Sequence, residues 1–169
     1  ESTYGNRIHE DVETRRHIIF DLIEEAAERG GTIMIPAFSL ERTQEFLYEL
    51  NTLSEYDKKL PRIPIFVDSP LAIKTIAVIK KYPQYFDDEA RKRYDAGDDF
   101  LNFPGLKLTL TKEESKAINT IRGPKMIIAG AGMMNGGRIV HHAIRYLSDP
   151  NSTLIIVGYQ AEGTLGRRL

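Results

Sequence analysis

The feature that most constrains the fold of this chain is a set of four short apolar runs, each bounded by turn residues. They read TIMIPA at residues 32–37, IPIFVD at 63–68, KMIIAG at 125–130 and TLIIVG at 153–158. Each run is rich in isoleucine or valine and alternates little between apolar and polar residues. This pattern is typical of strands that are covered on both faces of a sheet.

Helical patterns fill the intervals between these runs. Apolar residues at helix spacing predict helices over 9–29 and 40–56, and we also expect helices over 70–82, 112–121 and 137–148. Helices that alternate with strands imply a mostly parallel sheet with right-handed crossovers. The predicted fold is therefore α/β, with three layers in which a mostly parallel sheet is flanked by helices.

Two segments depart from this simple alternation. Residues 106–110, LKLTL, alternate clearly, which predicts an edge strand with Leu106, Leu108 and Leu110 facing inward. Residues 84–105 carry mixed charges followed by two phenylalanines. We expect a short helix and an irregular loop there, inserted over one edge of the sheet, with the charges on a solvated face.

Length and composition limit the function. A chain of 169 residues suits one domain, here 1–169, and its net charge of -1 gives no global attraction to nucleic acid or to acidic membranes. The absence of cysteine excludes disulfides, thiolate metal sites and a cysteine nucleophile. No apolar run approaches the roughly 20 residues that span a bilayer. Because the chain starts at Glu1 without a methionine, we expect it to be a segment of a longer protein.

Ligands of such sheets bind outside the carboxyl ends of the strands, so the residues there are the candidate site. Ser39 is expected to cap the helix after the first strand. After the second strand, Asp68 or Ser69 is expected to cap, with Pro70 at the first helical position. Asn135 is the candidate cap of the helix that follows the 125–130 run.

Two arginines occupy first helical turns at this edge, against the helix dipole. Arg42 and Arg138 would each be disfavoured there by about 0.3–1 kcal/mol when exposed. A bound phosphate would remove the conflict and would place both arginines along one groove. The alternative is that each arginine pairs with a nearby acid such as Glu41, Glu45 or Asp68.

The loop AGAGMMNGGR, residues 129–138, resembles a nucleotide-binding turn. Gly130, Gly132 and Gly136 follow a strand and precede a helix, which partly fits a dinucleotide site. However, the next strand ends IIVGYQ, without the acid or arginine that would read a ribose, and no Walker Gly-Lys-Ser/Thr is present. The glycines either admit another anion or make a tight turn. A nucleotide-dependent α/β enzyme and a protein-interaction module remain as alternatives.

The ionisable residues predict no metal site within the chain. Its four histidines are His9, His17, His141 and His142. Neighbours on a helix, such as the last two, point about 100° apart and cannot both reach one metal. No Ser-His-Asp arrangement has local support, and the carboxylates of Glu1 and Asp68 join a site only if strand ends bring them together.

Five stretches carry a resemblance to a known family. In order, they are ESTYGNRIH, IPAFSLERTQEFLYEL, IFVDSPLA, GMMNGGRIVHH and VGYQAEGTLGRRL. Together they resemble the Rossmann-like β-CASP domain of the metallo-β-lactamase-type ribonucleases, a group that includes the endonuclease of the cleavage and polyadenylation machinery. The resemblance covers nearly the whole chain.

The resemblance implies a function for the parent protein. In that family, the β-CASP domain is inserted into a metallo-β-lactamase domain, caps the cleft between the two and guides RNA to two zinc ions that hydrolyse phosphodiester bonds. The zinc ligands of the family are not in this sequence, so the chain alone is expected to hold no cofactor and to be inactive. The implied partners are RNA and the metallo-β-lactamase domain of the same chain, with no membrane; a homodimer of the parent is compatible with the family, and the implied location is cytoplasmic.

The resemblance also assigns residues. Glu1 matches the family's first motif, an acid that supports a catalytic histidine located beyond this chain. The residues expected to contact RNA and its phosphates are Ser39, Arg42, Asp68, Ser69, Gly132, Gly136, Gly137, Arg138, His142, Gly163, Thr164 and Arg167. One departure stands before GMM, where relatives usually carry serine and this chain has Gly130 and Ala131.

Overall fold

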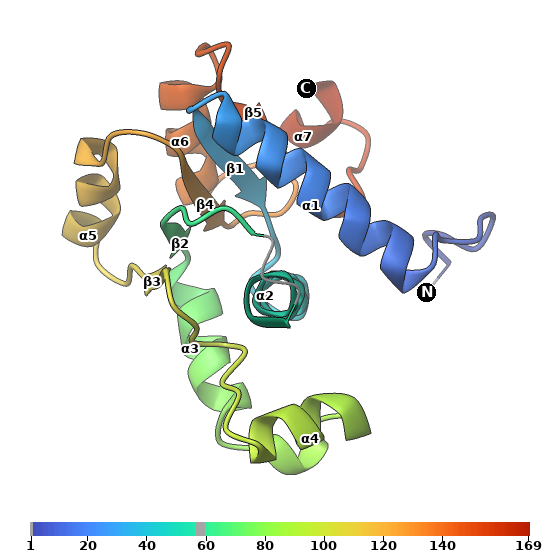
Figure 1. The fold of residues 1–169 in the computed structure, drawn as a ribbon. Helices are drawn as coiled ribbons and strands as arrows, with labels where there is room; N and C mark the ends of the chain where they lie inside the picture. The colour runs from blue at the N-terminus through green and yellow to red at the C-terminus, as the bar shows by residue number, and fades with distance from the viewer. Residues whose placement is uncertain (1, 57–59) are drawn as a thin grey trace.

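The computed structural model describes residues 2–56 and 60–169, so Glu1, the expected supporting acid, lies outside the described residues. A five-stranded sheet in the order β3-β2-β4-β1-β5 forms the centre, and every pair of neighbouring strands is parallel (Figure 1). The strands are β1 (Thr32–Pro36), β2 (Ile65–Val67), β3 (Leu106–Leu108), β4 (Lys125–Ala129) and β5 (Thr153–Leu154). The five predicted strands are confirmed, and each is shorter than its run in the sequence.

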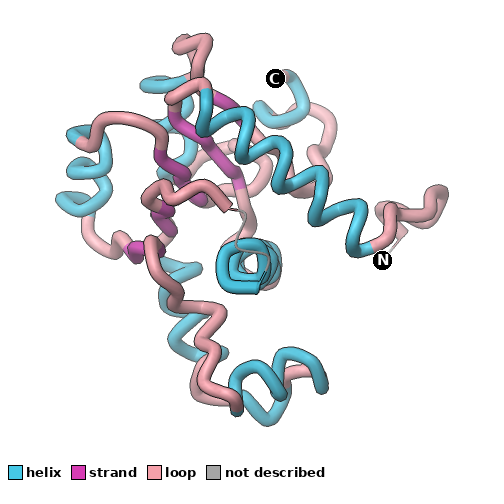
Figure 2. The backbone as a smooth tube through the Cα atoms, in the orientation of Figure 1, coloured by secondary structure: helices cyan, strands magenta, loops and turns pink. Residues whose placement is uncertain are grey.

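Helices cover both faces of this sheet (Figure 2). They are α1 (Val12–Glu28), α2 (Arg42–Asn51), α3 (Pro70–Ile79), α4 (Asp88–Asp95), α5 (Lys112–Ala117), α6 (Arg138–Tyr146) and α7 (Leu165–Arg168). Three short helical turns follow α2, α3 and α5, namely η1 (Thr52–Tyr56), η2 (Pro83–Tyr85) and η3 (Ile118–Thr120). The five predicted helices are confirmed. In residues 2–56 and 60–169, no helix combines the length and the apolar composition that crossing a membrane requires.

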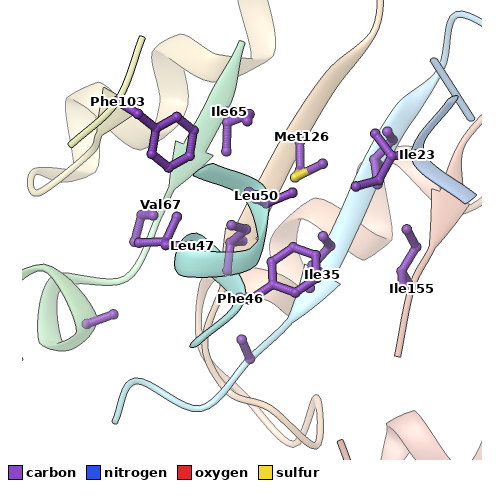
Figure 3. Packing of buried hydrophobic residues seen from close by; sticks show 14 of the residues in the cluster. Ile23, Ile35, Phe46, Leu47, Leu50, Ile65, Val67, Phe103, Met126 and Ile155 are labelled. Carbon is purple, nitrogen blue, oxygen red and sulfur yellow. The ribbon is translucent and has the colours of Figure 1, made fainter. Parts of the chain in front are cut away.

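Alternate residues of the central strands enter two separate cores. Ile33 and Ile35 of β1 join a larger core with residues of α1, α2 and α3 (Figure 3), whereas Met34 joins a smaller core with residues of α6 and η3. The strands β1, β2 and β4 are buried along their whole length, as their unbroken apolar runs predicted. Consequently α2 and α6, which both begin near the carboxyl edge, lie on opposite faces of the sheet.

The expectation that three leucines of the edge strand face inward is wrong for two of them. Leu106 packs against the larger core, but Leu108 and Leu110 are 40% and 45% exposed. The strand ends at Leu108, and the next residue, Thr109, turns inward instead, because its hydroxyl donates to Asp68 and to the carbonyl of Val67.

The segment 84–105 is more than a surface insertion. The expected short helix is α4, which has no buried residue, in agreement with a solvated charged face. The residues after it, however, are part of the larger core, where Phe100, Leu101 and Phe103 are buried. The two phenylalanines that follow the charges in the sequence therefore complete the layer of α2 and α3.

Two of the predicted helix caps are wrong, and one is confirmed. Ser69 caps α3 by accepting from the amide of Ala72, with Pro70 at the first helical position. Ser39 instead hydrogen-bonds Ser69, and α2 begins after Glu41 without a side-chain cap. Asn135 accepts from the amide of Leu165. The loops after β1 and β4 are longer than a minimal strand-to-helix turn, which frees both side chains for contacts with other segments.

Candidate nucleic-acid interface

A buried carboxylate organises the carboxyl edge of β2, β3 and β4. Asp68 directly follows β2 and is 0% exposed. Its Oδ1 accepts from the Thr109 hydroxyl and from Nη1 of Arg138, each at 2.7 Å. Its Oδ2 accepts from the Ser115 hydroxyl at 2.6 Å and lies 2.7 Å from Nε2 of His142. These donors come from three segments, namely the residue after β3, α5 and α6, so one carboxylate ties the ends of β2 and β3 to two helices.

The same contacts set the charge of Asp68. Burial opposes ionisation of this carboxyl, but the hydrogen bonds from His142, Ser115, Thr109 and Arg138 outweigh burial and lower its pKa to about 2. Asp68 is therefore an anion at neutral pH. Because Asp68 and His142 are both buried, neither side chain offers surface to a phosphate, and we assign them to holding the edge together rather than to RNA contact.

Most donors of the Arg138 guanidinium are used at this cluster of Asp68 and its four partners, which we call the hub. Besides Asp68, its Nη1 donates to the carbonyl of Thr109 and its Nη2 to the carbonyl of Leu110, both at 2.9 Å. The side chain is 18% exposed. Pairing with an acid, the alternative to a bound anion, is what the structure shows for this arginine.

Arg42 has a different environment. It pairs with Glu45, three residues on, at 2.8 Å, and both side chains are exposed. Exposed pairs of this kind contribute little, typically up to about 1 kcal/mol, so this guanidinium can turn to another anion at small cost. The side chain lines a groove of about 720 Å³ together with Arg15 and Arg16 of α1, Leu22 and Ile156.

The prediction that Arg42 and Arg138 share one groove is wrong. Arg42 lies at the start of α2, on the face of the sheet covered by the larger core, and Arg138 lies at the start of α6, on the other face. Arg138 is not among the residues that line the groove at Arg42. Both arginines do follow strands at the carboxyl edge, as predicted, but their helices lie on opposite faces of the sheet.

Two serines from different loops do meet at this edge. The hydroxyls of Ser39 and Ser69 are 3.0 Å apart, beside the first turn of α3. A Cβ atom added to Gly130 would lie 3.5 Å from each hydroxyl, which is ordinary van der Waals contact. The ends of β1, β2 and β4 therefore converge on one polar point, and this point has room for a side chain at residue 130.

Packing explains two glycines of the loop after β4. A Cβ atom on Gly132 would lie 2.8 Å from the ring of Phe38, and one on Gly137 would lie 2.3 Å from the carbonyl oxygen of Gly130. Gly136, in contrast, has open space around it. Since the loop needs Gly132 and Gly137 to fold against its neighbours, the glycine pattern no longer favours a dinucleotide site.

The same loop is attached to the last described segment. Gln160 donates to the carbonyl of Gly132, and the amide of Gly166 donates to the carbonyl of Met133. Thr164 caps α7 by accepting from the amide of Arg167. Gly163, Thr164 and Arg167 are thereby placed beside the loop of residues 130–137. Whether this set contacts RNA stays a prediction.

Sequence reasoning missed several residues of the site. Thr109, Ser115 and Gln160 make the contacts described above; Thr109 and Ser115 belong to no motif, and Gln160 lies in the stretch VGYQAEGTLGRRL but was not singled out. Thr109 meets Asp68 because β3 lies next to β2 with Leu108 opposite Val67. Only the strand order reveals this pairing, and the sequence does not contain that order in any local pattern.

The histidines lie in separate environments. His9 packs against Tyr4, His17 lies 3.5 Å from Asp21, and His142 contacts Asp68. Over residues 2–56 and 60–169, no three side chains of histidine, cysteine, aspartate or glutamate gather into a group that could hold a metal ion. The described residues therefore do not fit a zinc pair.

Large apolar side chains are exposed along the same edge. Each strand except β4 is followed by at least one such residue, between 45% and 65% exposed: Phe38 and Leu40 after β1, Leu71 after β2, Leu110 after β3 and Tyr159 after β5. Exposed apolar side chains that lie together at one edge are compatible with a surface that another part of a protein covers, although others, such as Ile144 and Tyr85, are exposed elsewhere.

Fold and site together define a class of protein: an α/β domain with an all-parallel sheet whose carboxyl edge carries both a polar hub and exposed apolar residues. The β-Casp domain model matches residues 43–169. The chain therefore belongs to the β-CASP domain family, and the fold and family suggested by the resemblance are confirmed.

Three relatives show which proteins carry such a domain. The chain is 38% identical over its whole length to Ribonuclease TTHA0252 of Thermus thermophilus, 32% identical to Transcription termination factor FttA of Methanosarcina mazei, and 34% identical to Cleavage and polyadenylation specificity factor 73 of Drosophila melanogaster. The matches include 100%, 100% and 99% of this chain. They correspond to only 38%, 27% and 24% of the length of the three relatives, so the chain spans well under half of each.

Proposed function

We propose that residues 1–169 form one domain of a longer ribonuclease, in which it caps the active-site cleft and guides RNA while phosphodiester bonds are hydrolysed. The observation that carries this proposal is the match of the whole chain to a protein named as a ribonuclease, at 38% identity. The proposal includes a cytoplasmic location, RNA as the ligand and a metallo-β-lactamase domain of the same protein as the partner. The exposed apolar residues that follow β1, β2 and β3 at the carboxyl edge support docking of that partner there.

Within this function, the residues of the edge divide into two groups. The half-buried Ser39 hydroxyl and the first turn of α3 present donors that suit a phosphate oxygen. The buried Ser69 hydroxyl positions both, as the partner of Ser39 and the cap of α3. Arg42 adds a charge that its exposed partner does not hold firmly. Asp68, Arg138 and His142 keep the loops in register. Glu1 keeps the proposed role of supporting acid in the parent protein.

We propose that the zinc ions lie outside this chain. Bound zinc would supply the activated water and polarise the scissile phosphate, and this chain would contribute positioning and charge. An isolated chain of residues 1–169 is expected to retain no stoichiometric zinc after dialysis and to leave RNA intact. Elemental analysis and an RNA cleavage assay check this, and stoichiometric zinc with cleavage that a chelator abolishes would contradict it.

Arg42 provides a test of RNA guiding. In the full-length protein, Arg42→Ala is expected to weaken binding of single-stranded RNA and to flatten the slope of log K against log salt by about 0.7, the value for one phosphate contact. Arg91→Ala is the matched control, because Arg91 forms a similar exposed pair with Asp95 on α4, which does not follow a strand. If the two variants show the same slope, Arg42 makes no phosphate contact.

A thermal-shift comparison separates this proposal from a nucleotide-dependent enzyme. The full-length protein is expected to be stabilised by a short 5′-phosphorylated RNA and not by NAD(P) at the same concentration. Stabilisation by NAD(P) but not by the RNA would contradict this proposal and favour a nucleotide-binding role for the loop of residues 130–137.

A further inference from the structure

Three aromatic rings meet where the first and last described segments come together. The ring of Tyr4 lies 4.9 Å from that of His9 and 6.4 Å from that of Tyr159, measured between centroids. Both pairs are edge-to-face, with interplanar angles of 76° and 87°. The cluster joins segments that are 150 residues apart and belongs neither to the two cores nor to the hub around Asp68.

Local backbone structure places Tyr4 in this cluster. The amide of Gly5 donates to the carbonyl of Ser2, and the amide of Arg7 donates to the carbonyl of Tyr4, so two turns overlap at this residue. Tyr159 follows β5 at the carboxyl edge. The segment of residues 2–10 precedes α1, whose first residues extend past the sheet (Figure 1).

The cluster is open to solvent and carries a cation. His9 is exposed, and Tyr159 is 46% exposed. The guanidinium of Arg7 lies 5.8 Å from the centroid of the Tyr4 ring. Arg7 forms no ion pair with any acid among residues 2–56 and 60–169. Its charge is therefore not neutralised within the described part of the chain.

This combination suits a nucleobase. The Tyr159 ring is not stacked on Tyr4 and is 46% exposed, so it can accept a base, which stacks on an aromatic face whatever its identity. Single-stranded nucleic acids are commonly bound by exposed aromatic side chains beside unpaired basic ones, with stacking worth about 1–3 kcal/mol per base, or roughly 5- to 150-fold in affinity. Packing of the rings alone would not need the Arg7 guanidinium, which has no acidic partner among residues 2–56 and 60–169.

We propose that Tyr4, His9 and Tyr159 form a stacking subsite for one base of single-stranded RNA, with Arg7 on the adjoining phosphate. The subsite rests on the proposed RNA-guiding function. It predicts little base preference, because every base presents a π-face, and it would hold the strand next to the groove that contains Arg42.

The test uses the full-length protein and a single-stranded RNA with 2′-O-methyl phosphorothioate linkages, which resist cleavage, and with 2-aminopurine at successive positions. Tyr159→Leu is expected to weaken binding at least fivefold and to remove the fluorescence quenching at one position. Tyr159→Phe keeps a ring and is expected to bind like the wild type. Tyr85→Leu is the matched control, because Tyr85 is 82% exposed on η2, outside the cluster.

The outcomes separate the subsite from the function on which it rests. If the wild type does not bind this RNA, the RNA-guiding function fails. If the wild type binds and Tyr159→Leu binds equally well, the subsite is overturned, and a fall in thermal stability alone would then assign the cluster to packing between the two segments of this chain. Should Tyr159→Leu not fold, Arg7→Ala, at an exposed side chain, is expected to weaken binding and to flatten the salt dependence, and unchanged binding would overturn the subsite.

Discussion

Replacing Asp68 with alanine is expected to lower the free energy of unfolding by about 3–5 kcal/mol. The substitution removes the acceptor shared by Arg138, His142, Thr109 and Ser115, and it leaves a mostly buried guanidinium without its counter-charge. Urea unfolding, monitored by circular dichroism, measures the loss. Glu45→Ala is the matched control, because it removes the acid from an exposed arginine pair and should change stability by no more than about 1 kcal/mol.

The effect should also depend on pH. The pKa of Asp68 is lowered from 3.8 to about 2 in the folded state, so its ionised form stabilises the fold above the unfolded pKa. That contribution is lost as the pH falls from about 4 to about 2. The wild type should therefore lose stability more steeply than Asp68→Asn over this window. Equal pH profiles, or a small effect of Asp68→Ala, would show that the carboxylate does not hold the edge together.

Replacing Gly137 with alanine is expected to cost about 2–4 kcal/mol of stability. Gly137 has φ 76° and ψ -176°, a backbone conformation that is essentially limited to glycine. The added Cβ would also lie 2.3 Å from the carbonyl oxygen of Gly130, an atom that accepts from the amide of Ile139 in the first turn of α6. Strain and steric overlap therefore act together at this residue.

Gly136 is the matched control for this prediction. It is the preceding residue, its φ is not in the left-handed region, and nothing lies within 4 Å of an added Cβ. Gly136→Ala should change the unfolding midpoint little. If both variants lost a similar amount of stability, the strain at Gly137 and its contact with Gly130 would not be the cause.

The sequence predicted the strands and helices well because burial leaves a clear local signal. The unbroken apolar runs that became β1, β2 and β4 reflect strands covered on both faces, and this requirement acts on each run separately. The prediction was wrong where a tertiary contact overrode the local pattern. Leu108 and Leu110 alternate like a half-buried strand, yet the inward place at the end of β3 belongs to Thr109, because Asp68 needs a donor there.

The candidate site was predicted less well, for a related reason. The dipole argument correctly marked Arg138 as an arginine that needs an anion, and the anion in the structure is Asp68, one of the acids named as an alternative. Which side of the sheet a helix occupies depends on the handedness of each crossover and on the strand order. The sequence does not give that order, so the common groove for Arg42 and Arg138 could not be tested from sequence alone.

The attachment of α7 to the loop of residues 130–137 decides where this domain can be divided. Three bonds, from Gln160 to Gly132, from Gly166 to Met133 and from Leu165 to Asn135, join the two segments, and an added Cβ on Gly166 would lie 1.9 Å from the Gln160 side chain. An excision that stopped after β5 would keep the whole sheet and still remove the support of the loop. Residues 160–169 are thus part of the folded unit. A domain shortened before them is expected to keep its hydrophobic cores while the loop of residues 130–137 loses its fixed position.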